Sequence, residues 1–172
     1  MSQCFYYVDG IPTKGKWIDM DLITDTDEVL EELAEAGYVQ RNEGGEPEYG
    51  GDLLVADAEG LAKAFLGRYG TFDFDDFVDC RDYLDSRQCT APEEALIVYI
   101  NYAGSWSKSD FEEVYNGEHD SEKSFAEELV DELGYLSEMP EHLRSYFDYE
   151  KFARDIFITD YWFEDGFVFR RN

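Results

Sequence analysis

Residues 120–134 read DSEKSFAEELVDELG and predict an amphipathic helix with an acidic outer face. Ser121 is a typical N-cap residue and Gly134 is a typical residue to end a helix, so we expect the helix over Ser124–Leu133. The apolar positions expected to face inward recur at every fourth residue and are Phe125, Leu129 and Leu133. The carboxylates between them are therefore expected to face solvent.

Two carboxylates per turn would give this face a charge density close to that of duplex DNA. One helical turn rises ~5.4 Å, so such a face carries one charge per ~2.7 Å, against one per ~1.7 Å of axis in DNA. Two upstream runs predict similar ridges: Asp27, Glu28, Glu31, Glu32 and Glu35, and then Asp73, Asp75, Asp76, Asp79, Asp82 and Asp85. A single acidic run is more often only the solvated face of a helix, so no run decides the function alone.

Outward from this helix, the chain divides into three segments that predict an α+β fold, built as an elongated chain of three small subdomains. Residues 1–60 predict an antiparallel sheet plus a helix, residues 61–104 a helical middle, and residues 105–172 a second α+β part. Strands are expected at Phe5–Val8, Lys16–Met20 and Asp52–Ala56, with a strand pair within Tyr161–Arg170. Helices are expected at Asp25–Ala36, Leu61–Gly67, Phe74–Asp85, Pro92–Tyr102, Ser109–Val114 and Asp148–Asp155, and a turn-rich loop at Arg41–Gly51.

The charge balance is strongly acidic. The chain carries 41 Asp and Glu against 14 Lys and Arg, a formal net charge of −27. The three segments contribute −12, −4 and −11 in chain order. Because ordinary solvated surfaces mix the two signs, we expect a partner with a strongly positive surface; solubility or adaptation to salt is the alternative explanation. Direct binding of nucleic acid is not expected, since it requires clustered Lys and Arg.

Composition also bounds the class of protein. Hydrophobic residues make up 44% of the chain, with 13 Phe, 13 Tyr and 3 Trp, so it folds rather than remaining disordered. Cys4, Cys80 and Cys89 are odd in number and lack CxxC spacing, which predicts neither a disulfide framework nor a zinc site. The start, MSQCFYYVDG, does not read as a signal peptide, and no apolar run approaches the ~20 residues of a membrane span. A cytoplasmic protein without membrane contact is expected.

The sequence offers little for catalysis. His119, in an expected helix-entry loop, and His142 lie in no nucleophile or zinc-protease motif. A calcium loop starting at Asp73 fails, because its sixth and twelfth positions are Val78 and Leu84. An enzyme with a Cys–His pair or paired carboxylates that meet only in space is the catalytic alternative. We therefore expect no enzyme, no cofactor and no metal site.

The C-terminal third resembles the ArdA antirestriction family. Phe111–Phe157 contains FEEVYNGEHDS, an acidic helix, a P-x-x-L segment and DYEKFARDIF, similar to that family's motifs in the same order. Upstream, GKWID at Gly15–Asp19 and LVADAEG at Leu54–Gly60 are also similar to family elements. The match is weakest at the start of the chain and over Gly67–Ala95.

This resemblance implies a non-catalytic, cofactor-free homodimer, carried by conjugative elements or phages, that mimics bent duplex DNA. The implied partner is a type I restriction-modification enzyme, whose DNA-binding groove the protein fills. The function is implied to be spread over many carboxylates, for which we nominate Asp110, Glu112, Glu113, Glu118, Asp120, Glu122, Glu127, Glu128, Asp131 and Glu132. A general acidic binding module or chaperone that shields a basic partner, without imitating duplex geometry, is the alternative.

Overall fold

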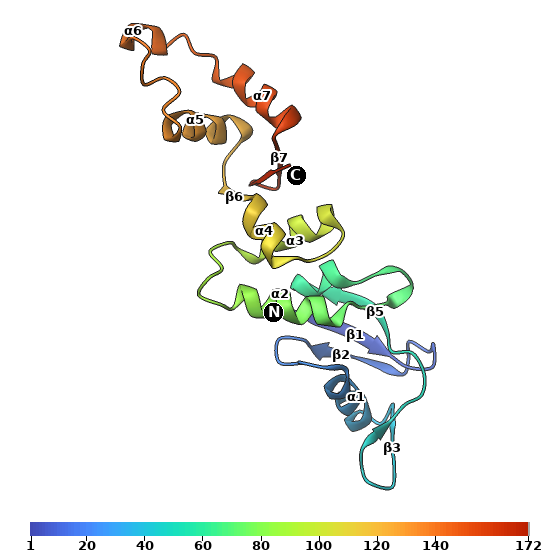
Figure 1. Ribbon diagram of the computed structural model, residues 1–172. Helices are drawn as coiled ribbons and strands as arrows, with labels where there is room; N and C mark the ends of the chain where they lie inside the picture. Colours follow the sequence, from blue (N-terminus) through green and yellow to red (C-terminus); the bar gives the residue numbers. More distant parts are fainter. Residues whose placement is uncertain (172) are drawn as a thin grey trace. The chain divides into compact units, whose positions relative to one another are not determined.

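The computed structural model describes residues 1–171, which form two compact units. Unit 1 is Met1–Lys108, and unit 2 begins at Ser109. Both units contain helices and a small antiparallel sheet (Figure 1), so the predicted α+β class is confirmed. This division lies close to the predicted boundary after residue 104, and the predicted boundary after residue 60 lies inside unit 1. The three-subdomain organisation stays a prediction.

The sheet of unit 1 is built around its first strand. β1 (Gln3–Tyr7) pairs antiparallel with β2 (Gly15–Asp19) on one side and with β5 (Leu54–Glu59) on the other. Side chains alternate between the two faces of a strand, and Cys4 and Tyr6 of β1 are accordingly buried. The three strands predicted in this segment are confirmed, with ends that differ by one to three residues.

Helix α1 (Thr26–Glu35) confirms the helix predicted over Asp25–Ala36, and it packs against β2. Asp25 is its N-cap, and Val29 and Leu33 are its buried residues. The turn-rich loop predicted at Arg41–Gly51 is mostly turn and loop, but it also contains strand residues that were not predicted: β3 (Gln40–Arg41) and β4 (Pro47–Glu48) form a short hairpin that packs against α1. Two-residue strands are too short to show the alternation that identifies a strand in a sequence.

The remainder of unit 1 is helical and comprises η1 (Gly60–Phe65), η2 (Arg68–Gly70), α2 (Phe74–Leu84) and α3 (Glu93–Ala103). The short helix expected from Leu61 is a 3-10 helix, whereas α2 and α3 confirm their predictions. Arg81 of α2 is buried and donates hydrogen bonds to the carbonyl oxygens of Met20 (3.0 Å) and Ile23 (2.6 Å). These bonds join the helical middle to the chain between β2 and α1.

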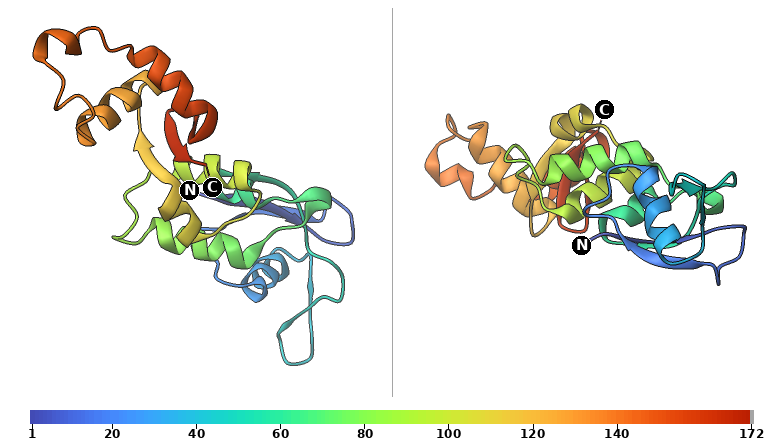
Figure 2. Two further views of the ribbon diagram at one scale, coloured as in Figure 1. Left: turned by 45° about the horizontal axis from the view of Figure 1, so that its top comes forward. Right: turned by 90° about the horizontal axis from the view of Figure 1, so that it is seen from below.

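Unit 2 contains α4 (Lys108–Val114) except for its first residue, followed by β6 (Tyr115–Glu118), α5 (Glu122–Glu132), α6 (Glu141–Arg144), α7 (Tyr149–Thr159), β7 (Tyr161–Glu164) and β8 (Phe167–Arg170). β8 is the central strand, antiparallel to β6 and β7. Helices α5 and α7 pack side by side (Figures 1 and 2), and the core is built on Phe125, Phe157 and Val168. Among residues 1–171, no helix is long and apolar enough to cross a membrane.

One residue of the predicted inner face of α5 lies elsewhere. Phe125 is buried and Leu129 packs against the core from a half-buried position, but the side chain of Leu133 is 55% exposed. Leu133 is the C-cap, beyond the last residue of the helix. The four-residue spacing of apolar residues continues to Leu133, but the neighbouring elements leave more than half of this residue exposed.

Candidate partner-binding surface

The start of α5 is fixed by a reciprocal capping box. The backbone N–H of Ser124 donates to Oγ of Ser121 at 3.1 Å, and the backbone N–H of Ser121 donates to Oγ of Ser124 at 3.0 Å. Phe125, Ala126 and Val130 face the interior. With both the start and the buried face set, the helical phase directs the intervening carboxylates outward.

All ten carboxylates nominated from the sequence are exposed on unit 2. We refer to them as the unit 2 carboxylates: Asp110, Glu112 and Glu113 on α4, Glu118 at the end of β6, Asp120 before α5, and Glu122, Glu127, Glu128, Asp131 and Glu132 on α5. Phe111 and Val114 fill the buried side of α4, which leaves its acids outside. The unit 2 carboxylates are therefore accessible to a partner.

Few cations neutralise the α5 face. Glu128 lies 3.7 Å from Nδ1 of His119, a contact that is an ion pair only when the imidazole is protonated. Within residues 1–171, no Lys or Arg makes a salt bridge with Glu127, Asp131 or Glu132. From residue 109 onward the chain has 18 acids and 6 bases, so this face keeps a strong negative potential.

The structure adds an acid that the sequence analysis did not nominate. Glu150 of α7 lines an open hollow together with Asp120, Ser121 and Glu122 at the start of α5. It lies 3.5 Å from Lys123, which also lines this hollow. The packing of α7 against α5 brings Glu150 to this place, and spacing within one helix carries no sign of such a neighbour.

The acids of α1 are largely engaged within unit 1. The guanidinium of Arg41 donates hydrogen bonds to the carboxylate of Glu31, and these bonds lower the pKa of Glu31 from its ordinary value. Lys16 lies 2.7 Å from Glu32, and Glu28 accepts the backbone N–H of Thr24 at 2.6 Å. Three carboxylates of the predicted acidic ridge on α1 are therefore engaged in ion pairs or hydrogen bonds, namely Glu28, Glu31 and Glu32.

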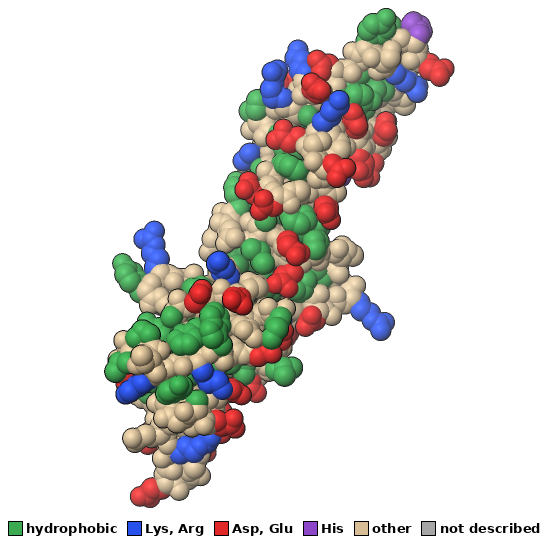
Figure 3. Space-filling model, turned by 180° about the vertical axis from the view of Figure 1, so that it is seen from behind, with side chains coloured by type: hydrophobic (Ala, Val, Ile, Leu, Met, Phe, Trp, Pro, Cys, Tyr) green, Lys and Arg blue, Asp and Glu red, His purple; other side chains and the backbone are tan. Residues whose placement is uncertain are grey.

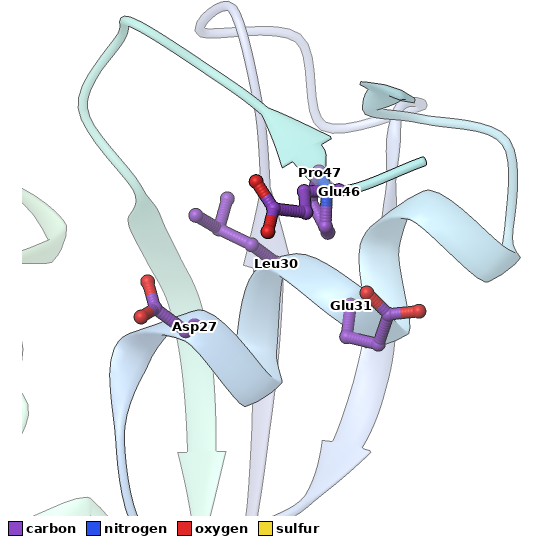
Figure 4. Close-up of a pocket in the computed structure, with 5 residues that line it drawn as sticks. All are labelled: Asp27, Leu30, Glu31, Glu46 and Pro47. Carbon is purple, nitrogen blue, oxygen red and sulfur yellow. The ribbon is translucent and has the colours of Figure 1, made fainter. Parts of the chain in front are cut away.

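A hollow of about 390 Å³ lies between α1 and the β3–β4 hairpin. Figure 4 shows Asp27, Leu30 and Glu31 on α1 and Glu46 and Pro47 on the hairpin, with the three carboxylates on different sides of the hollow. Among residues 1–171, no group of three or more His, Cys, Asp or Glu is arranged to hold a metal ion.

The short-armed acids around α2 support the fold. Asp73 caps the helix, Asp79 accepts the indole N–H of Trp106 at 2.7 Å, and Asp82 lies 2.9 Å from Arg81. Desolvation and the neighbouring Asp73 raise the pKa of Asp76, although the backbone N–H of Trp106 opposes that shift. These acids are used mainly for capping and for contacts within unit 1.

His119, Cys4 and Cys80 pack within the fold. Nε2 of His119 lies 3.1 Å from the carbonyl oxygen of Asn116, and its ring stacks edge-on against Phe125. Burial raises the pKa of the Cys4 thiol to about 12 and raises that of Cys80 as well. Both thiols are therefore protonated near neutral pH, which opposes a role as a nucleophile.

Figure 3 shows one face of the molecule, over which Asp and Glu side chains are widely spread while Lys and Arg are fewer. The model of the family described as antirestriction protein (ArdA) matches residues 4–169. A search of curated proteins returned no match. Because the family match spans nearly the whole chain, the protein belongs to the ArdA antirestriction family.

Proposed function

We propose that this protein is an antirestriction DNA mimic that occupies the DNA-binding groove of a type I restriction-modification enzyme and competes with the DNA substrate. The observation that carries the proposal is the exposure of all ten unit 2 carboxylates in a chain of the ArdA family. On α5, no Lys or Arg of residues 1–171 makes a salt bridge with Glu127, Asp131 or Glu132. A groove that binds DNA is lined by Lys and Arg, to which a dense row of carboxylates is complementary.

The charge is sufficient for such a role. At the DNA density of one charge per ~1.7 Å, the net charge of −27 would cover roughly 45 Å, or about thirteen base pairs. A homodimer, which we include in the proposal, would double that length. Binding is shared among many carboxylates, so replacing one of them should have little effect.

A competition titration tests the proposal. A type I restriction-modification enzyme is bound to labelled duplex, and this protein is added at a low and a high salt concentration while displacement of the duplex is followed. We expect stoichiometric displacement that weakens at high salt, because screening reduces the attraction between carboxylates and the groove. Absence of displacement by the folded protein, or displacement with no dependence on salt, would contradict the mimicry.

The second candidate is a general acidic module that shields basic proteins. The large net charge alone favours it, because charge attracts any cationic surface. Adding an excess of a basic protein that does not bind duplex specifically, such as lysozyme, distinguishes the two. A duplex mimic should keep its inhibition in this competitor, whereas a general module should lose it.

A further inference from the structure

The sheet of unit 1 has a side that packs against helices and an opposite side that carries aromatic rings. Cys4, Tyr6 and Ile18 alternate onto the packed side and are buried, and η1 and α1 contact the sheet. We call the opposite side the outer face. It carries Phe5 on β1 and Trp17 on β2, and Trp17 is 40% exposed.

The two rings of the outer face hold each other in place. Phe5 lies directly opposite Trp17 in the antiparallel register, and their ring centroids are 5.7 Å apart in an edge-on orientation. Gly15 leaves room for the Phe5 ring, because a Cβ at that position would lie 2.9 Å from the Cε1 atom of Phe5. Trp17 is therefore already ordered, which keeps the entropy lost on binding a partner small.

Two exposed carboxylates flank these rings. Asp19 is two residues along β2 from Trp17, and Asp57 of β5 lies opposite Phe5 on its other side. Each accepts one backbone N–H, at 3.0 Å and 2.9 Å respectively, and within residues 1–171 neither makes a salt bridge with Lys or Arg. None of the strand residues that alternate onto the outer face is Lys or Arg, and Lys16 pairs with α1 instead.

An exposed indole with carboxylates beside it is complementary to a guanidinium. The ring attracts a cation over its face, and a planar guanidinium stacks on the ring while its N–H groups donate to carboxylates. An ammonium is a compact and strongly hydrated charge that does not stack in this way. A nucleic acid or a second copy of the outer face would be repelled, since residues 1–60 carry a net charge of −12. The occupant that fits is an arginine side chain of a cationic protein.

We infer that the outer face is an arginine-binding surface, at which a guanidinium of the restriction-modification enzyme stacks on Trp17 and bonds to Asp19 or Asp57. The identity of this partner rests on the proposed function, whereas the preference for arginine rests on the outer face alone. Carboxylates by themselves attract both Lys and Arg, so Trp17 adds a distinction between the two cations that charge does not supply.

Acrylamide quenching of tryptophan fluorescence tests the preference on the full chain without the enzyme. Trp106 and Trp162 are 6% and 8% exposed, so the quencher reaches mainly Trp17. We expect a hexa-arginine peptide to reduce quenching about twofold, because stacking covers the indole, and a hexa-lysine peptide of the same charge to leave it nearly unchanged. Equal protection by the two peptides, or protection by neither, would overturn the inference.

A variant that keeps both rings tests the role of the carboxylates. Asp19→Asn with Asp57→Asn leaves the contact between Phe5 and Trp17 intact, and protection by the arginine peptide should fall. The matched control, Glu43→Gln with Glu48→Gln, removes two exposed acids of unit 1 outside the outer face and should keep the protection. An equal loss in both variants would mean that overall charge holds the peptide, which would overturn the inference.

The competition titration tests the contact with the enzyme. Trp17→Leu removes the indole but keeps an apolar side chain beside Phe5, and Tyr102→Leu makes a similar change at a ring of α3 that is 60% exposed. We expect Trp17→Leu to need about three- to fivefold more protein for half displacement, and Tyr102→Leu to match the unmodified chain. Circular dichroism checks that both variants are folded.

The outcomes distinguish the arginine preference from the proposed function. If the unmodified chain does not displace duplex while the arginine peptide still protects Trp17, the proposed function and the named partner are wrong and the arginine preference is supported. Displacement by Trp17→Leu as strong as that by the unmodified chain would overturn the contact with the enzyme. A halved mass of Trp17→Leu in sedimentation would assign the outer face to association between copies and overturn the inference.

Discussion

Helices α1 and α5 carry similar acidic runs, yet they present different surfaces. On α1, Glu31 is bonded to Arg41, and Glu32 lies beside Lys16. On α5, the described part of the chain places no Lys or Arg in a salt bridge with Glu127, Asp131 or Glu132. The number of carboxylates on a helix therefore does not give the charge that a partner meets.

The difference originates in what lies beside each helix. The β3–β4 hairpin supplies Arg41 to α1, and β2 supplies Lys16. Helix α5 packs against α7, whose Lys151 and Arg154 are exposed and form no salt bridge with Glu127, Asp131 or Glu132 in the part of the chain described. We expect α5 to contribute more than α1 to binding of a cationic partner, and the predictions below test this comparison.

The largest expected effect comes from removing the side chain that anchors α5. Phe125 is 5% exposed and contacts the rings of Phe157 and Tyr161, so Phe125→Ala should destabilise unit 2 by about 3–5 kcal/mol. Hydrogen exchange should show faster exchange in α5 and β8 with little change in α1. Phe125→Leu, which keeps most of the volume, should lose much less, and an equal loss for both variants would show that packing is not the cause.

The next effect concerns binding. Replacing Glu127 and Glu128 by Gln, Asp131 by Asn and Glu132 by Gln should weaken displacement of duplex about ten- to hundredfold at low salt and reduce its dependence on salt. The matched control removes four exposed acids of unit 1 by replacing Glu43, Glu48 and Glu59 by Gln and Asp52 by Asn. If the control loses as much as the α5 variant, total charge decides binding and the comparison fails.

Removing a helix cap should have a smaller effect on stability, and only one of the two caps should also affect binding. Ser121→Ala removes the capping box of α5, and Asp25→Ala removes the side chain that accepts the backbone N–H of Glu28 at 3.0 Å in α1. Each should cost about 1 kcal/mol in denaturant unfolding. Only Ser121→Ala should also weaken displacement of duplex, because fraying would disorder the start of the α5 face. Equal weakening by both variants would assign the same importance to α1.

The features that the sequence predicted correctly are those set by residues close together in the chain. Ser121 caps α5 as expected, and apolar spacing placed Phe125 on the buried face of that helix. Each of these features depends on residues within one or two turns of a helix. The exposure of Glu128, Asp131 and Glu132 followed from the phase of the same helix.

Features that depend on distant neighbours were missed. β6 pairs Tyr115 with Phe169 of β8, and nothing near Tyr115 in the sequence marks that partner. Leu133 follows the spacing of a core residue but has no covering element. Arg41 was assigned to a loop, so its pairing with Glu31 was not foreseen. The sequence therefore predicted where the acids lie, and only the packing gave which of them are neutralised.

The smallest expected effect concerns that pairing. Arg41→Gln removes the hydrogen-bonded cation beside Glu31, so the pKa of the Glu31 carboxyl should rise toward its ordinary value. Arg41→Lys should keep part of the lowering, because an ammonium retains the charge but not the planar two-pronged contact. An NMR titration of the Glu31 carboxyl carbon in the three proteins measures these shifts.

The same pair gives a dependence of stability on pH with a definite sign. Since the folded pKa of Glu31 lies below the unfolded one, the ion pair stabilises the fold above the ordinary Glu pKa, and this contribution is lost as pH falls through the folded pKa. The stability difference between the unmodified chain and Arg41→Gln should therefore be present near neutral pH and shrink in acid. A difference that stays constant into acid would mean that Arg41 stabilises unit 1 through its hydrogen bond to the Gly45 carbonyl. Glu31 would then count as an open carboxylate, and the ion pair between Lys16 and Glu32 would be the remaining electrostatic difference between α1 and α5 in this comparison.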